Sequence, residues 1–276
     1  MLNTEVNGDM PWIIFKLCRS NYAITSDLVA GISELPSEIV PIPSADPAFM
    51  GVSVMRGQII PLLNLRKFFG MPLLEDEYRE FVDEMELRKQ DHVNWVNEVR
   101  RCVESGDEFR LTTDPEACKF GRWLADFQTE RNELKSHLQH IKKPHARLHK
   151  LAEEIFSPDT DKETRDELLY ELESYYKPKV LGLLDEGKEI FAAHYKGIVL
   201  LVQSKSSEGY MGLVCDEVSS VEGISIVFDE KDLRKLYSSE YISGVAHSER
   251  VDGEIVMLDA ERLMGLCPLI DELSAK

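Results

Sequence analysis

Four side chains near the middle of the chain are of types that bind transition metals. Cys118 opens the run Cys118–Leu124, His92 precedes it, and His145 and His149 follow it. Three imidazoles and one thiolate are enough to close a tetrahedral zinc shell with no open position. His145 and His149 are four residues apart, so on a helix they lie on one face and can reach one ion. These residues therefore predict a zinc site.

Cys118 gives the predicted site a second kind of chemistry. A zinc-bound thiolate is deprotonated at neutral pH, and an oxidant that reaches it can convert it to a sulfenic or sulfinic acid. Oxidation would weaken the bond between sulfur and metal and let the local segment rearrange. Cys118 is therefore the candidate redox-sensing residue. The simpler alternative is a zinc ion that only stabilises the fold.

Two further histidines are rival ligands. His137 and His140 lie one or two helical turns before His145, and their helical phase with His149 is less favourable. Pro144 predicts a helix break between the two groups, because proline lacks the N–H that an interior helical residue donates.

The segment from about residue 74 to residue 191 has the apolar spacing of helices. We expect helices over residues 75–104, 126–141, 145–156 and 160–191, the last with a kink or break at Pro178. Pro115 predicts the start of a further helix that carries Cys118. Gly121, between large apolar residues, predicts a close approach of two backbone segments. Four or five helices joined by short turns are typical of an antiparallel bundle.

Strand patterns occupy both sides of this helical segment. They cover residues 12–17, 22–24, 50–55 and 58–65 before it, and 197–203, 211–216, 218–226, 241–246 and 254–258 after it. The turn at Arg56 and Gly57 predicts a hairpin. A β segment of about 60 residues is marginal alone, so we expect one β domain, residues 10–73 and 192–270, interrupted by a bundle, residues 74–191. The predicted fold class is α+β.

Composition limits the classes of partner and compartment. The 276 residues include 32 basic and 50 acidic side chains, a formal charge of −18, which argues against binding nucleic acid or an anionic membrane surface. No apolar run approaches the length that spans a bilayer, and residues 1–10 do not resemble a secretory signal. Five scattered cysteines form no disulfide pattern. We expect a cytoplasmic protein without membrane insertion.

The central motifs resemble a known family. His92-Val93-Asn94-Trp95, then Cys118-x-Phe120-Gly121-x-Trp123-Leu124, then His145-x3-His149 is similar to the chemoreceptor zinc-binding (CZB) domain. The resemblance implies that His92, Cys118, His145 and His149 are the ligands of Zn²⁺. It also implies sensing of zinc or hypochlorous acid, and a homodimer formed through the helices.

The flanking segments resemble a second family, the CheW-like coupling domain. Its three signatures are matched in order by residues 51–66, 211–218 and 241–259. The resemblance implies two five-stranded β-barrels sharing a core, and an adaptor that docks the histidine kinase CheA to chemoreceptor tips, with Arg56 and Gly57 in the partner-binding turn.

The chain departs from the CheW-like pattern at a few positions. Val54 and Met55 stand where the family usually has Asn-Leu, and Asn64 where it often has Asp. Gly31 stands where members often have an acid that can pair with the arginine of the turn; Glu34, Glu38 or another nearby acid could replace it.

From these patterns we predict a non-catalytic signalling adaptor located at chemoreceptor arrays. The first alternative is a zinc-stabilised scaffold with no sensing role. The second is a zinc hydrolase, which would require Cys118 or His92 not to ligate and Glu153 or Glu154 to act as the base. The sequence contains no Gly-rich phosphate loop and no serine nucleophile motif.

Overall fold

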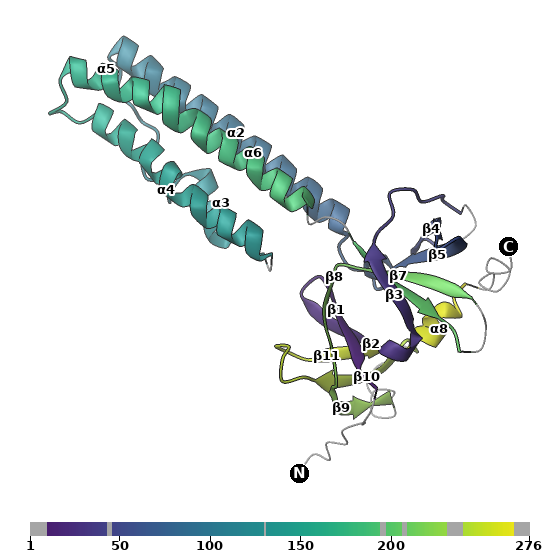
Figure 1. Cartoon of the computed structure of the whole chain (residues 1–276). Coiled ribbons are helices and arrows are strands. Elements are labelled where there is room, and N and C mark those ends of the chain that lie inside the picture. The colour runs from purple at the N-terminus through teal and green to yellow at the C-terminus, as the bar shows by residue number, and fades with distance from the viewer. Residues whose placement is uncertain are drawn as a thin grey trace. The chain divides into compact units, whose positions relative to one another are not determined.

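The chain folds into two compact units. The computed structural model describes residues 10–42, 46–129, 131–193, 197–205, 209–230 and 240–267. One unit, the β unit, contains Met1–Leu74 together with Lys196–Lys276, and the other, the helical unit, contains Glu75–Tyr195 (Figure 1). Among the described helices, none is both long enough and apolar enough to cross a membrane.

The β unit contains two sheets. Its first half supplies β1 (Trp12–Leu17), β2 (Ser20–Thr25), β3 (Val29–Glu34), β4 (Phe49–Met55), β5 (Gln58–Asn64), the short 3-10 helix η1 (Ser26–Leu28) and α1 (Leu65–Phe68). Its second half supplies β6 (Ile198–Gln203), β7 (Tyr210–Cys215), β8 (Glu217–Glu222), β9 (Ser225–Asp229), β10 (Ile242–His247), β11 (Ile255–Leu258) and α8 (Ala260–Met264). The strand orders are β8-β1-β2-β11-β10-β9 and β3-β6-β7-β5-β4.

Both sheets combine strands from the two halves of the chain. β1 pairs with β8 and β2 with β11 in the six-stranded sheet, while β3 pairs with β6 and β5 with β7 in the five-stranded sheet. The predicted α+β fold, a β domain interrupted by a helical segment, is thus confirmed. The sheets have six and five strands where the resemblance implied five and five, because β8 adds to the edge of β1.

The five-stranded sheet is buried on both faces. Leu62, Val199 and Leu201 face one apolar cluster, whereas Leu63 and Leu200 face a second cluster shared with the six-stranded sheet. Alternate residues of a strand point to opposite faces, so burial of both faces requires the nearly continuous apolar runs of β5 and β6.

The hairpin predicted at Arg56 and Gly57 is confirmed. Met55 pairs with Gln58 across the turn, and the φ angles are +52° at Arg56 and +80° at Gly57. Positive φ at both central residues is the signature of a type I′ turn, whose twist matches that of the two strands it joins.

A buried ion pair joins the two halves of the β unit. Arg66 of α1 donates from Nε and Nη2 to the two carboxylate oxygens of Asp216, each at 2.6 Å. Arg66 is 4% exposed and also donates to the Pro72 carbonyl at 2.9 Å. Asp216 accepts the backbone N–H of Cys18 at 2.6 Å. This pair connects the end of the first half to the end of β7.

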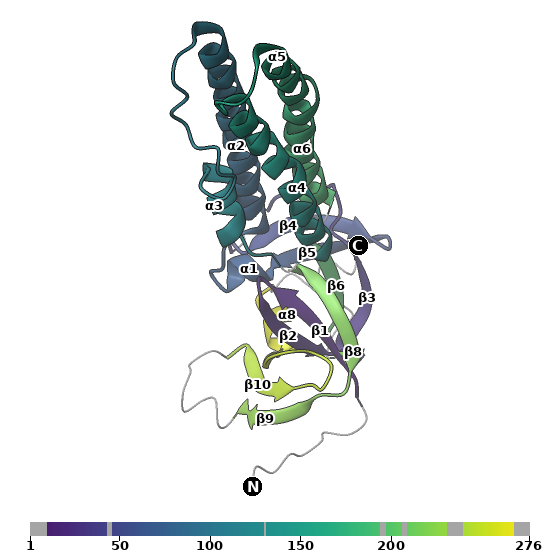
Figure 2. The same ribbon diagram turned by 90° about the vertical axis from the view of Figure 1, so that its left-hand side faces the viewer.

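The helical unit is a bundle of long helices. It contains α2 (Leu74–Ser105), α3 (Lys119–Asp126), α4 (Asn132–Ile155), α5 (Lys162–Glu171), a π-helical turn (Leu172–Tyr176) and α6 (Lys177–Ala193). α2 and α6 lie side by side in both views (Figures 1 and 2). Ion pairs join them, Lys89 to Asp185 at 2.7 Å and Lys188 to Glu86.

The helix break predicted at Pro144 is wrong, because α4 continues through it. A proline inside a helix costs about 3 kcal/mol. α4 buries apolar residues on both sides of Pro144, among them Leu138, Ile141, Leu148 and Leu151. Burial of each large aliphatic side chain contributes about 1.5–3 kcal/mol, so packing outweighs the local cost.

The helix has no break at Pro178, but the turn that precedes this residue departs from α-helical geometry. The π-helical turn Leu172–Tyr176 separates α5 from α6, and Pro178 is the second residue of α6. A π turn is one of the usual places at which a helix bends or changes phase.

We predict that Arg66→Ala lowers the free energy of unfolding of the β unit by about 3 kcal/mol, because it leaves the Asp216 carboxylate in a largely buried place without its cation. Urea titration followed by circular dichroism measures this. The matched control is Arg250→Ala, whose side chain is 79% exposed beside Glu222 and should cost below about 1 kcal/mol. Equal losses in the two variants would contradict the prediction.

Candidate metal centre

Three helical elements bring the four predicted ligand residues into one cluster. His92 lies in α2, Cys118 is the residue before α3, and His145 and His149 lie on successive turns of α4. One ligand atom of each lies within 4.8 Å of the others, and Cys118 Sγ is 3.3 Å from His145 Nε2. Ligand atoms around a tetrahedral zinc are roughly 3.5 Å apart, so a small contraction would complete a shell.

The rival histidines lie outside this cluster. The Nε2 atom of His137 is 2.7 Å from the carbonyl oxygen of Leu183 in α6, and His140 is exposed. With α4 continuous through Pro144, the phase of a single helix separates both residues from His145 and His149.

Buried nitrogens without hydrogen-bond partners show that the cluster fits a metal ion. The three histidines are 1–4% exposed. Within the part of the chain that the structure describes, His92 Nε2 and both ring nitrogens of His149 have no partner. A buried polar group without a partner costs about 1–3 kcal/mol. A cation bound by these lone pairs would remove that cost, and a set of three imidazoles and one thiolate is typical of Zn²⁺.

The surroundings orient the imidazoles. His92 Nδ1 is 2.7 Å from the Arg88 carbonyl oxygen, so Nδ1 carries the proton and Nε2 keeps a free lone pair for a metal. Trp95 lies with its ring 4.5 Å from that of His149 and donates from Nε1 to the Thr112 carbonyl at 3.0 Å. Phe120 packs edge-on against His92 and His145. These aromatic rings limit the access of water.

The electrostatics favour neutral imidazoles. Burial, together with the charges that His92 and His149 would carry, lowers the pKa of His145 to about 2. Burial, then the charge on His92, lowers the pKa of His149 to about 4, and burial also lowers the pKa of His92. Neutral imidazole is the form that ligates a metal.

Without a cation the thiol of Cys118 is protonated. Burial raises its pKa, and the backbone N–H groups of Gly121 and Phe120 oppose that rise. A divalent cation at this position would lower the pKa of Cys118 and stabilise the thiolate.

Cys118 also caps α3. Its Sγ accepts the backbone N–H of Gly121 at 3.2 Å, which satisfies one of the unpaired donors at the start of the helix. A Cβ atom on Gly121 would lie 1.9 Å from the Pro115 carbonyl oxygen. The close backbone approach predicted for Gly121 is therefore confirmed.

The partner-binding turn predicted at Arg56 and Gly57 lies in the β unit. Arg56 is exposed and donates from Nη1 to the Ala30 carbonyl at 3.0 Å. Within the described ranges no carboxylate, Glu34 and Glu38 included, forms an ion pair with Arg56.

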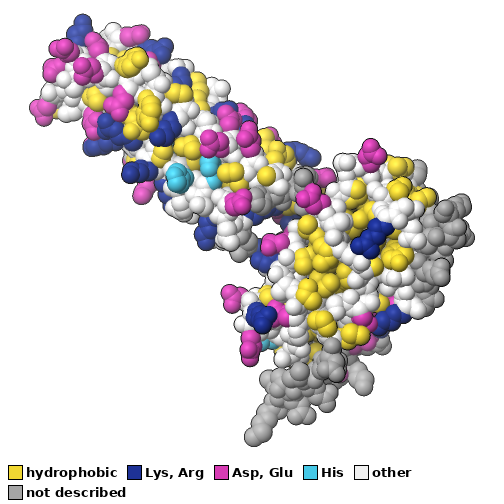
Figure 3. Space-filling model, viewed as in Figure 1, with side chains coloured by type: hydrophobic (Ala, Val, Ile, Leu, Met, Phe, Trp, Pro, Cys, Tyr) yellow, Lys and Arg dark blue, Asp and Glu magenta, His cyan; other side chains and the backbone are white. Residues whose placement is uncertain are grey.

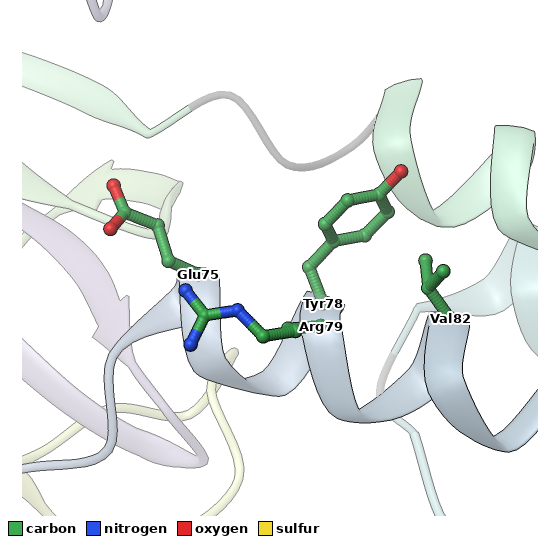
Figure 4. Close-up of a pocket in the computed structure, with 4 residues that line it drawn as sticks. All are labelled: Glu75, Tyr78, Arg79 and Val82. Carbon is green, nitrogen blue, oxygen red and sulfur yellow. The ribbon is translucent and has the colours of Figure 1, made fainter.

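A surface pocket at the start of α2 lies apart from the cluster residues. Glu75, Tyr78, Arg79 and Val82 line it, all from the first turns of one helix (Figure 4). It contains none of the four candidate ligands and suggests no chemistry of its own.

Comparisons with known proteins agree with this architecture. Residues 11–105 match the model of the CheW-like domain, and residues 92–156 match that of the chemoreceptor zinc-binding domain. The crystal structure of the scaffolding protein TtCheW from Thermoanaerobacter tengcongensis aligns over 91% of this chain and 88% of its own, at 12% identity and a TM-score of 0.39. So low a score supports no conclusion. Comparison with curated proteins gave no match.

The segments matched are thus those of a CheW-like domain and of a chemoreceptor zinc-binding domain. That combination supports a signalling adaptor of the chemotaxis type, which interacts with other chemotaxis proteins.

The supporting residues were harder to predict than the candidate ligands. Trp95 and Phe120 stood in the motifs, but only the fold shows them against His149, His92 and His145. The contact of His92 with the Arg88 carbonyl cannot be predicted from the sequence, because every residue has a backbone carbonyl.

We predict that Gly121→Ala weakens zinc binding and destabilises the helical unit, because the new Cβ displaces the Pro115 carbonyl and with it the segment that ends at Cys118. Gly182→Ala is the control. It lies in α6 with nothing within 4 Å of the added Cβ, and should stabilise the helix by up to about 1 kcal/mol. Zinc competition with a chromophoric chelator and thermal unfolding measure both. A Gly121→Ala protein with unchanged zinc affinity would contradict the structure.

Acid should destabilise the metal-free helical unit. Each histidine has a pKa of about 6.5 in the unfolded chain, and burial lowers it in the folded unit. Below about pH 6.5 the unfolded state therefore binds more protons, and the free energy of unfolding falls by up to about 1.4 kcal/mol per pH unit for each histidine.

Chelator-treated protein unfolded in urea between about pH 7.5 and 5 should show this loss. His145→Leu should reduce the slope, and His140→Gln, on an exposed side chain of the same helix, should leave it unchanged. Stability that is independent of pH over this range would show the prediction to be wrong.

Proposed function

We propose that this chain is a non-catalytic chemotaxis coupling protein whose inserted domain binds Zn²⁺ through His92, Cys118, His145 and His149. The observation that carries the proposal is the convergence of these four ligand atoms within 4.8 Å, inside a segment that matches a zinc-binding domain. We take residues 10–73 and 192–270 as the CheW-like domain and residues 74–191 as the insertion, in line with the two compact units.

In this proposal the zinc site is a sensor of zinc availability or of an oxidant such as hypochlorous acid. Cys118 supports a sensing role over a purely structural one, because its side chain is only partly buried whereas the three histidines are buried. When bound, the ion would hold Cys118 as a thiolate, which is the form that oxidants attack.

Loss of a ligand or of the metal would affect the packing of the rest of the bundle. Cys118 Sγ also caps α3, and the aromatic residues of α3 pack on the neighbouring helices: Trp123 and Phe127 contact Phe81 of α2. Phe81 in turn stacks on Phe191 of α6. Oxidation of Cys118 would therefore alter the packing of both α2 and α6.

The output in this proposal is altered docking of a histidine kinase of the CheA type, of a chemoreceptor tip, or of both, at cytoplasmic chemoreceptor arrays. The match to the CheW-like domain supports this output. Arg56 and Gly57 would form part of the docking surface. A homodimer through the helical unit is the proposed oligomer.

The zinc hydrolase alternative has less support. A hydrolase needs an open coordination position and a nearby base, whereas four converging ligands fill a tetrahedral shell. Glu154 forms an ion pair with Arg147 at 2.9 Å, and Glu153 with Lys150 at 3.0 Å, so both candidate bases have other partners.

We predict one tightly held zinc ion per chain, lost or loosened after a pulse of hypochlorous acid. Metal analysis and thiol titration before and after the pulse measure this, with Trp95 fluorescence as a reporter of the ring beside it. Cys118→Ala should bind zinc more weakly and lose the response, and Cys102→Ala, at a buried cysteine outside the cluster, should keep both.

Two outcomes would count against the proposal. A protein without zinc would remove the metal site. Full zinc occupancy with an unreactive Cys118, and with an unchanged response in Cys118→Ala, would leave a zinc-stabilised scaffold.

A further inference from the structure

The Arg56 guanidinium lies directly over the backbone of Gly31. A Cβ atom at position 31 would lie 2.4 Å from Arg56 Nη2 and 3.1 Å from Cζ. The absence of a side chain at position 31 thus makes room for the guanidinium. Its recorded hydrogen bond goes from Nη1 to the Ala30 carbonyl of β3, so most of its five N–H donors remain available.

This position is unusual in so acidic a chain. The protein has 50 acidic against 32 basic side chains, and most of its described arginines form ion pairs with carboxylates. Among those that do are Arg66, Arg79, Arg88, Arg100, Arg101, Arg110, Arg147, Arg250 and Arg262. Within the described ranges Arg56 has no such partner, although it is exposed and carries a full positive charge.

The backbone at Arg56 is strained. Its φ of +52° lies in the left-handed region, which disfavours side chains other than those of Gly, Asn and Asp. Asn-Gly is the most favourable pair for a type I′ turn. Arginine at this position therefore costs stability, which fits a residue retained for its side chain.

An exposed aliphatic side chain lies close to Arg56 in the sequence. Val54 of β4, two residues before Arg56, is 72% exposed. The visible face of the β unit carries hydrophobic side chains in the region of β3 and β7, with few charged groups among them (Figure 3). An arginine beside exposed apolar groups is a common centre of protein–protein contact.

We infer that the partner of this chain supplies a carboxylate that binds Arg56 over Gly31, with an apolar side chain next to that carboxylate to cover Val54. The bare glycine gives a planar carboxylate access to the guanidinium, where two parallel hydrogen bonds can form. The inference rests on the proposed function, since it describes the partner that the adaptor docks. Gly31 is then a specificity-determining position, because an acidic side chain there would pair with Arg56 within the chain in place of the partner's carboxylate.

The test uses the full chain with two purified probes from its source organism, a CheA kinase and a chemoreceptor cytoplasmic tip. Arg56→Asn places Asn-Gly in the turn, so its melting temperature should equal or exceed that of the wild type while its affinity falls at least about tenfold. Gly31→Glu should also lose affinity, because the new carboxylate pairs with Arg56 within the chain. Gly31→Ala, which only shifts a flexible side chain, should stay within about threefold.

A charge exchange identifies the carboxylate directly. Arg56→Glu in this chain and replacement of an acidic partner residue by arginine should each abolish binding. The two changes together should restore it. If Arg56→Asn and Gly31→Glu both keep an affinity within about twofold of the wild type, the inference is overturned and the adaptor function still stands. Failure of the wild type to bind either probe would overturn the proposed function, and the inference with it.

Discussion

The β unit can form only after the chain has returned from the helical unit. Every sheet contains pairs between strands of the first half and strands of the second, including the parallel pairs β2–β11 and β5–β7. The Arg66–Asp216 ion pair fixes the same connection at the level of side chains. The insertion must therefore return the chain close to the point where it left, and a bundle whose first and last helices are neighbours does so at little cost in loop entropy.

The candidate metal centre likewise brings together segments that are distant in the sequence. Its ligands come from α2, the start of α3 and α4, so an ion there would join three segments that the sequence separates. α6 supplies none of them and is held to α2 in part by ion pairs. An ion at the site would therefore link α2, α3 and α4 directly, and a change of ligand or metal would reach α6 only through packed side chains such as Phe81 and Phe191.

The sequence was a good guide where local rules agree with packing. The spacing of His145 and His149, the Gly121 between aromatic residues and the turn at Arg56 and Gly57 depend on short-range geometry, and their local geometry is as expected. The helix break predicted at Pro144 was wrong because the burial of apolar side chains that stabilises α4 across this residue is seen only in the tertiary structure. The Arg88 group next to His92 Nδ1 is a backbone carbonyl, and Arg56 lies against Gly31 because that residue has no side chain. Residue identity does not encode such contacts.

The π-helical turn at Leu172–Tyr176 sets the rotational phase of the last helix. Leu172, Val180 and Leu184 are fully buried at multiples of four residues, and in a regular α-helix residues four apart drift by about 40° per step. The wider turn absorbs part of that drift and keeps these residues on one face. Removing a single residue from this turn would be equivalent to rotating the whole of α6 by about 100°. The direction in which α6 presents its side chains is therefore set by one extra residue in the turn that precedes it.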